Sequence, residues 1–167
     1  NSVDLPLLAR MSKIRQITAL GQAARRQAGI DPDRRLRQAI VGLLPQHKDE
    51  LSEFGLYHDL VAQLLGAAQV QFTSDLVTHS EWRLALNPDG AIERDVAPAS
   101  INTAMAALDA DAAASLASQL WDGLTVSLKV NGRAITLLPD EVRISVQAQP
   151  GWVAVADTKF LVLLETG

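Results

Sequence analysis

Residues 16–44 read QITALGQAARRQAGIDPDRRLRQAIVGLL and contain both kinds of secondary structure expected in this chain. Up to Ala28 the apolar residues recur at helical spacing, and Gly29 is a typical left-handed C-terminal cap. After a short turn, the segment 36–44 is rich in Ala, Ile, Val and Leu and stops at Pro45, which indicates a buried strand. A helix followed directly by a buried strand predicts a mixed fold.

The helix is predicted to run from Val3 to Ala28. Its opposite face carries Arg15, Gln22 and Arg26 on one line, which we expect to face solvent or a ligand. Small residues on the apolar stripe allow a neighbouring helix to approach closely, so we expect this helix to belong to a helical bundle. The predicted stripe consists of Ile14, Ile17, Gly21, Ala24 and Ala28.

The middle of the chain predicts a small α/β layer. A helix is expected over Asp49–Gly66, followed by short strands at 70–73 and 82–86. The Ala-rich stretch 98–121 is expected to form one or two helices, broken near Asp109.

Beyond Gly123 the period of the apolar residues changes to two. Residues 124–137 alternate on either side of Asn131-Gly132, the strongest short-range signal for a hairpin. Three further strands are predicted at 142–146, 152–156 and 160–164. The expected fold class is therefore α+β: a long N-terminal helix, a small α/β layer and C-terminal antiparallel β-hairpins. We divide the chain into residues 1–34, the last helix of a bundle, and 35–167, an appended α+β domain.

Charge is distributed unevenly. The first 48 residues hold nine of the 15 Lys+Arg and three of the 19 Asp+Glu, a balance of +6, so the remainder carries −10. Basic residues spread along a helix and its exit suit a polyphosphate track better than a single phosphate pocket. The alternative is a solvated helix face. The candidate binding residues are Lys13, Arg15, Arg25, Arg26, Arg34, Arg35 and Arg37.

Several classes of site are not expected. The chain has no Cys, and its three His are scattered, so no metal site is predicted. Neither a Ser-His-Asp set nor a Gly-rich phosphate loop stands out, and the paired carboxylates fall at predicted helix starts or turns, so no catalytic residue is predicted. No apolar run approaches the roughly 18 residues of a membrane span, which favours a cytoplasmic protein.

Two regions resemble isoleucyl-tRNA synthetases. Residues 11–30, MSKIRQITALGQAARRQAGI, followed by RRLRQ at 34–38, are similar to the last helix of the anticodon-binding bundle, which leads into an Arg-Gln-Pro-Leu strand start; here the proline is displaced to Pro32. In the second region, four short stretches are similar to the close of the zinc-free, eukaryote-like class of that enzyme: VNGR at 130–133, LLPDEV at 137–142, GWVAVAD at 151–157 and LVLLET at 161–166.

The resemblance implies the carboxy-terminal portion of an isoleucine–tRNA ligase that positions the anticodon arm through its phosphates. Chemistry with ATP and Mg²⁺ would lie in upstream domains, so neither a catalytic site nor a cofactor is expected in this chain. The implied partners are isoleucine-accepting tRNA and the remainder of the synthetase, with the protein a monomer.

One segment departs from the family pattern. Family members commonly carry a basic, Gly-containing segment where this chain has DGAIERD at 89–95, so the same RNA contact is not expected there. The alternative function, from another class, is a docking module in which the apolar helix stripe and the Ala-rich region contact another polypeptide without RNA. The salt dependence of binding separates the two hypotheses.

Overall fold

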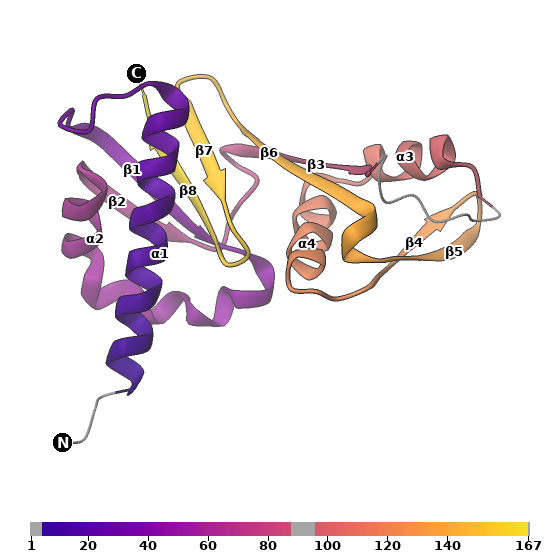
Figure 1. Cartoon of the computed structure of the whole chain (residues 1–167), viewed down its shortest axis with the longest axis horizontal. Coiled ribbons are helices and arrows are strands. Elements are labelled where there is room, and N and C mark those ends of the chain that lie inside the picture. The colour runs from indigo at the N-terminus through magenta and orange to yellow at the C-terminus, as the bar shows by residue number, and fades with distance from the viewer. Residues whose placement is uncertain (1–4, 88–95, 167) are drawn as a thin grey trace.

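The computed structural model describes residues 5–87 and 96–166 (Figure 1). It is an α+β structure built around one four-stranded sheet and two β-ribbons. In chain order the elements are α1 (Leu5–Ala28), β1 (Leu36–Leu43), the 3-10 helix η1 (Pro45–Tyr57), α2 (His58–Leu65), β2 (Ala67–Thr73), β3 (Ser80–Leu86), α3 (Pro98–Ala106), α4 (Ala110–Trp121), β4 (Val126–Val130), β5 (Arg133–Leu137), the short 3-10 helix η3 (Pro139–Glu141), β6 (Val142–Ala148), β7 (Trp152–Ala156) and β8 (Phe160–Glu165).

The four-stranded sheet has the order β2-β1-β8-β7. Strands β1 and β2 are parallel and are joined by η1 and α2, which confirms the predicted α/β layer except for the strand at 82–86, because β3 pairs with β6 in a separate sheet. Strand β8 pairs antiparallel with both β1 and β7. Both central strands are almost wholly buried, because each face of the sheet is covered, and this explains their continuous apolar sequences.

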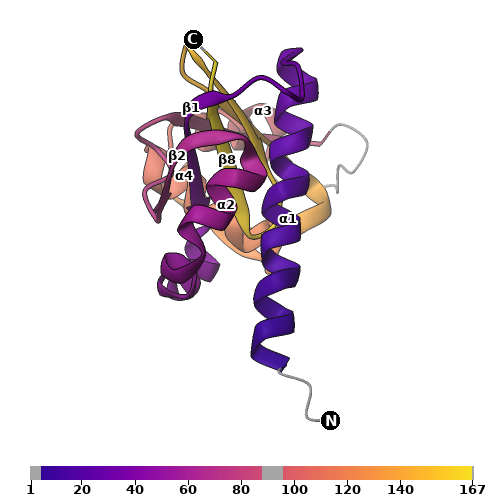
Figure 2. The same ribbon diagram turned by 90° about the vertical axis from the view of Figure 1, so that its left-hand side faces the viewer.

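Helix α1 lies across one face of this sheet, with α2 beside it (Figure 2). Ile14, Ile17 and Ala24 are buried in the core that the helix shares with β1 and β8. A Cβ placed on Gly21 would lie 2.4 Å from Leu65 Cδ2, so this glycine lets α1 and α2 approach closely. The predicted stripe is thus covered within this chain, although Ala28 is exposed. The bundle and the division at residue 34 stay predictions.

The part of the chain between β2 and β7 packs against the other face of the sheet. Ribbons β3–β6 and β4–β5 pack with α3 and α4 around a second core, which includes Trp82, Met105 and Leu120 (Figure 1). Ile40 and Leu163 of the central strands belong to this core. The four-stranded sheet therefore separates two cores.

Most local predictions are confirmed. Asn131 and Gly132 have positive φ values of 52° and 81° in the turn of the predicted hairpin. The Ala-rich stretch breaks as expected at Asp109, whose side chain accepts a hydrogen bond from Ala112 N at 2.7 Å and caps α4. Gly29 ends α1 with φ 67°.

One local prediction is wrong. The expected single helix over residues 49–66 is divided into η1, which begins at Pro45, and the shorter α2. Gly55 is a weak helix former in the middle of this segment, and the tighter 3-10 winding changes which side chains face inward. Phe54 is buried, whereas Leu60 and Leu64 are partly exposed.

Candidate nucleic-acid interface

The outer side of α1 presents two exposed arginines. Arg15 and Arg26 lie eleven residues apart, which is close to three helical turns, so both project from the same side. Both are exposed, and neither forms an ion pair with another residue of the described ranges 5–87 and 96–166. Their outward direction agrees with the face predicted from the helical period.

The loop between α1 and β1 presents two more exposed arginines. The Ile30 N–H donates to Arg25 O at 2.8 Å, and the Arg34 N–H donates to Asp31 O at 3.1 Å, so the loop is closed by its own backbone. The carboxylate of Asp31 accepts a further hydrogen bond from the Asp33 N–H at 2.9 Å. Arg34 and the residue after it, Arg35, are exposed beyond this turn.

Two of the basic side chains reach the end of β8. Arg34 Nη2 donates to Thr166 O at 3.2 Å. Arg37 Nη1 lies 3.8 Å from Glu165 Oε1, but the Arg37 side chain is 89% exposed, so this ion pair is weak and leaves the guanidinium accessible. The arginine surface, as we define it, therefore consists of Arg15, Arg26, Arg34, Arg35 and Arg37.

Arg25 does not belong to this surface, which corrects the prediction from sequence. The residue is buried, with 7% of its area exposed. Its guanidinium donates to four backbone carbonyls, those of Asp31, Arg34, Leu65 and Gly66. A signal existed in the sequence: Arg25 lies four residues after Gly21 and so falls at the margin of the apolar stripe.

Lys13 is also bound to another residue of the protein. Its Nζ forms an ion pair with Glu50 Oε1, and both side chains are mostly buried. Glu50 also contacts His47 Nδ1 at 3.1 Å and Lys159 Nζ at 3.9 Å. Burial raises the pKa of Glu50, but the hydrogen bond from Lys13 and the nearby Lys159 and His47 outweigh it, so the pKa lies below its ordinary value. Lys13 serves this cluster rather than an external anion.

This cluster was not predicted from the sequence. His47 connects it to the end of α4, because its Nε2 lies 3.1 Å from Asp122 Oδ1. The spacing of His47 and Glu50, three residues apart, was the only local signal. We call the set Lys13, His47, Glu50, Asp122 and Lys159 the Glu50 cluster.

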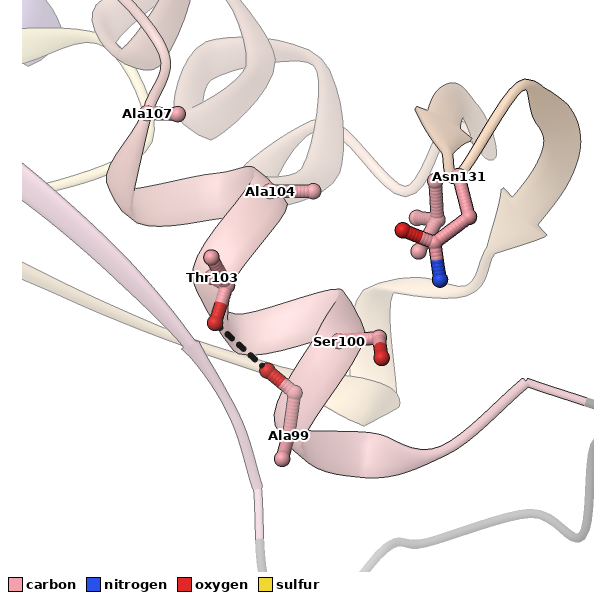
Figure 3. A pocket seen from close by; sticks show the side chains of 7 residues that line it. Ala99, Ser100, Thr103, Ala104, Ala107 and Asn131 are labelled. Carbon is pink, nitrogen blue, oxygen red and sulfur yellow. Dashed lines mark hydrogen bonds between the residues drawn. The ribbon is translucent and has the colours of Figure 1, made fainter.

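A shallow hollow of about 300 Å³ lies between α3 and the turn of the β4–β5 hairpin (Figure 3). Its lining consists of small side chains of α3 and of Ala107, which follows the helix, together with Val130 and Asn131. Thr103 Oγ1 at its edge donates to Ala99 O at 2.9 Å, so this hydroxyl serves its own helix. The hollow contains no charged group and offers no chemistry of its own.

Among the described residues, no group of His, Asp and Glu side chains is arranged to hold a metal ion. No helix in the described ranges is long and apolar enough to cross a membrane. The segment 89–95, which departs from the family pattern, lies outside the described residues.

Two curated proteins resemble the chain over nearly its whole length, and both are ligases that act with tRNA by name. One is the isoleucine–tRNA ligase of Streptomyces coelicolor, 31% identical over 172 residues, which cover 98% of this chain and 15% of that protein. The other is the isoleucine–tRNA ligase of Streptomyces avermitilis, 26% identical over 165 residues, which cover 99% of this chain and 15% of that protein. The chain thus spans about 15% of the length of these relatives. No protein-family model matches it.

Proposed function

We propose that the chain is the carboxy-terminal, tRNA-binding portion of an isoleucine–tRNA ligase of the zinc-free, eukaryote-like class. The observation that carries this proposal is the arginine surface, in which Arg15, Arg26 and Arg35 are exposed and form no ion pair with any described residue. The similarity to two isoleucine–tRNA ligases supports the identity of the partner. Contacts to phosphates fix the register of a bound RNA without reading its sequence.

The role that follows is to position the anticodon arm. Stacking on unpaired bases needs exposed aromatic side chains, and Trp152 is only partly exposed and packs on His79 with ring centroids 5.2 Å apart. In the parent enzyme, upstream domains would carry out the aminoacylation with ATP and Mg²⁺. The protein would act as a monomer in the cytoplasm, holding isoleucine-accepting tRNA for those domains.

The proposal is tested with Arg15→Gln combined with Arg26→Gln. Binding of an isoleucine tRNA transcript to the 167-residue chain is measured by filter retention across a series of salt concentrations. We expect weaker binding, and a slope of log affinity against log salt that is shallower by about 1.4–1.8, because each of the two phosphate contacts contributes roughly 0.7–0.9.

The matched control is Lys129→Gln combined with Arg143→Gln. These residues are exposed on β4 and β6, and their substitution changes the net charge by the same amount. The control should keep the parental slope. Parental affinity and slope in the α1 variant would remove the helix from the RNA site.

A second candidate function is docking on another polypeptide, which one observation favours. Leu56 is 89% exposed, and Leu60 and Leu64 follow it at intervals of four residues and are partly exposed. Exposed leucines that lie close together are typical of protein contacts. On this alternative the remainder of the synthetase covers them. The binding of this chain to the remainder of the synthetase would then change little with salt concentration. Loss of that binding in the double variant Leu56→Ser with Leu64→Ser would favour docking over RNA contact.

A further inference from the structure

Arg25 is a buried cation whose two terminal nitrogens, Nη1 and Nη2, donate hydrogen bonds to the backbone. Nη1 donates to Asp31 O at 2.9 Å and to Arg34 O at 2.8 Å, both in the loop between α1 and β1. Nη2 donates to Leu65 O at 3.0 Å and to Gly66 O at 3.3 Å, where α2 ends. One planar guanidinium thus joins the last turn of α1, the loop and the end of α2.

The loop that Arg25 holds is the loop that presents part of the arginine surface. Arg34, whose carbonyl is one of the acceptors, is itself an exposed arginine, and Arg35 follows it. The Gly66 carbonyl accepts both Arg25 Nη2 and the Leu36 N–H, which lies 2.8 Å away at the start of β1. The backbone on either side of Arg34 and Arg35 is therefore fixed to the same point.

The charge of Arg25 is not neutralised by an acid. Among its partners in the described residues, every acceptor is a backbone carbonyl and none is a carboxylate. A guanidinium that is satisfied only by dipoles keeps its positive charge beneath the loop, where it adds to the field of Arg34 and Arg35. Arg25 could not meet a phosphate directly without losing these hydrogen bonds.

We propose that Arg25 is a positioning residue for RNA binding: its buried guanidinium sets the α1–β1 loop so that Arg34 and Arg35 meet neighbouring phosphates of the bound strand. This inference rests on the proposed RNA contact, and it attributes the arrangement of the contacting arginines to Arg25. It also distinguishes two contributions of Arg25, its charge and its four directed hydrogen bonds. Lysine keeps the charge but lacks the planar set of donors.

The experiment measures affinity for the isoleucine tRNA transcript and its salt slope in Arg25→Lys, in Arg34→Gln with Arg35→Gln, and in the triple combination. We expect the double variant to reduce the slope by about 1.4–1.8. Arg25→Lys should reduce the slope by a similar amount, although the side chain at position 25 touches no phosphate. The triple variant should bind no more weakly than the double variant, because Arg25 acts only through the loop.

The outcomes separate the two proposals. If the double variant keeps parental affinity and slope, the loop does not contact RNA and the proposed function fails at this site. If the double variant weakens binding but Arg25→Lys does not, the RNA contact stands and the positioning role is overturned. Additive losses in the triple variant would overturn it too, because they would show an independent contact by Arg25.

A general loss of stability must be kept apart from a positioning effect. Met105→Ala removes a buried side chain from the second core, far along the chain from the loop, and serves as the matched control. It should melt earlier yet bind the transcript with parental affinity and slope. If Arg25→Lys does not fold, Gly66→Ala replaces it, since a Cβ there would lie 2.5 Å from Arg25 Nη2 and displace the guanidinium.

Discussion

The two ends of the basic helix use their cations differently. Near its C-terminal end, buried Arg25 is held by backbone carbonyls, and exposed Arg26 forms no ion pair with a described residue. Nearer its N-terminal end, Lys13 meets Glu50, which also contacts His47 and Lys159. Arg25 and Arg26 keep their positive charge, whereas the charge of Lys13 is neutralised by Glu50. The charge of a helix therefore predicts a binding surface only where the fold brings no acid beside it.

The largest effect on stability is expected at Gly66, whose carbonyl accepts a hydrogen bond from Arg25. Gly66 has φ 70°, and an added Cβ would lie 2.5 Å from Arg25 Nη2. Gly66→Ala should therefore lower the free energy of unfolding by about 2–3 kcal/mol, through backbone strain and the displaced hydrogen bonds. Urea denaturation measures the change.

Gly29→Ala is the control for that substitution. Gly29 has nearly the same φ, 67°, but an added Cβ would meet nothing within 4 Å. Its cost should be limited to the strain of the left-handed conformation, about 1 kcal/mol. Equal losses in the two variants would show that the contact with Arg25 adds nothing to stability.

An intermediate effect is expected in the Glu50 cluster. Glu50→Gln leaves Lys13 and Lys159 without their carboxylate and should cost about 1 kcal/mol at neutral pH. Because the pKa of Glu50 is lowered by folding, its contribution is present above the ordinary value of 4.5 and is lost as the pH falls through the folded value. Unfolding free energy measured from pH 7 to pH 3 should fall less steeply in the variant than in the parent.

If the unfolding free energy of Glu50→Gln falls between pH 7 and pH 3 as steeply as that of the parent, or more steeply, Glu50 is not stabilised by its cationic neighbours. Gln keeps the size of the side chain, so packing is not the variable. Asp122→Asn is the matched comparison, because it removes a carboxylate that contacts only His47 among the described ion pairs. It should lose less stability than Glu50→Gln.

The smallest effect is expected when one cation is exchanged for Gln, either Arg35 in the loop that follows α1 or Lys13 near the N-terminal end of the helix. Arg35→Gln should make the salt slope of tRNA binding shallower by about 0.7–0.9, the contribution of one phosphate. Lys13→Gln should leave the slope unchanged, because Lys13 already has an anionic partner. A lower slope for Lys13→Gln would remove the distinction between the two regions.

The parts of the fold that the sequence predicts are those decided by local chemistry. Asn131-Gly132 permits the tight turn, Gly29 ends α1, and Asp109 caps α4. The place of β8 between β1 and β7 could not be predicted, because it depends on the pairing of Ala39 with Leu164, far apart in the chain. No local pattern specifies which distant strands become neighbours.

The same limit explains the errors in the candidate site. The helical period places Arg15 and Arg26 outside correctly. It could not show that the end of α2 would bring the Gly66 carbonyl to Arg25, or that η1 would bring Glu50 to Lys13. Those partners come from elements 37 or more residues later, so they belong to tertiary structure and not to the pattern of the helix.

The central position of β8 also determines when the sheet can form during translation. Strand β1 pairs on one side with β2, which follows it closely, but its other side pairs with residues about 120 positions later. A ribosome adding roughly 5–20 residues each second needs on the order of ten seconds to make that stretch. Throughout that interval a nascent β1 has one row of unpaired backbone groups and can pair with strands of other chains. Completion of the sheet must therefore follow translation of the end of this region.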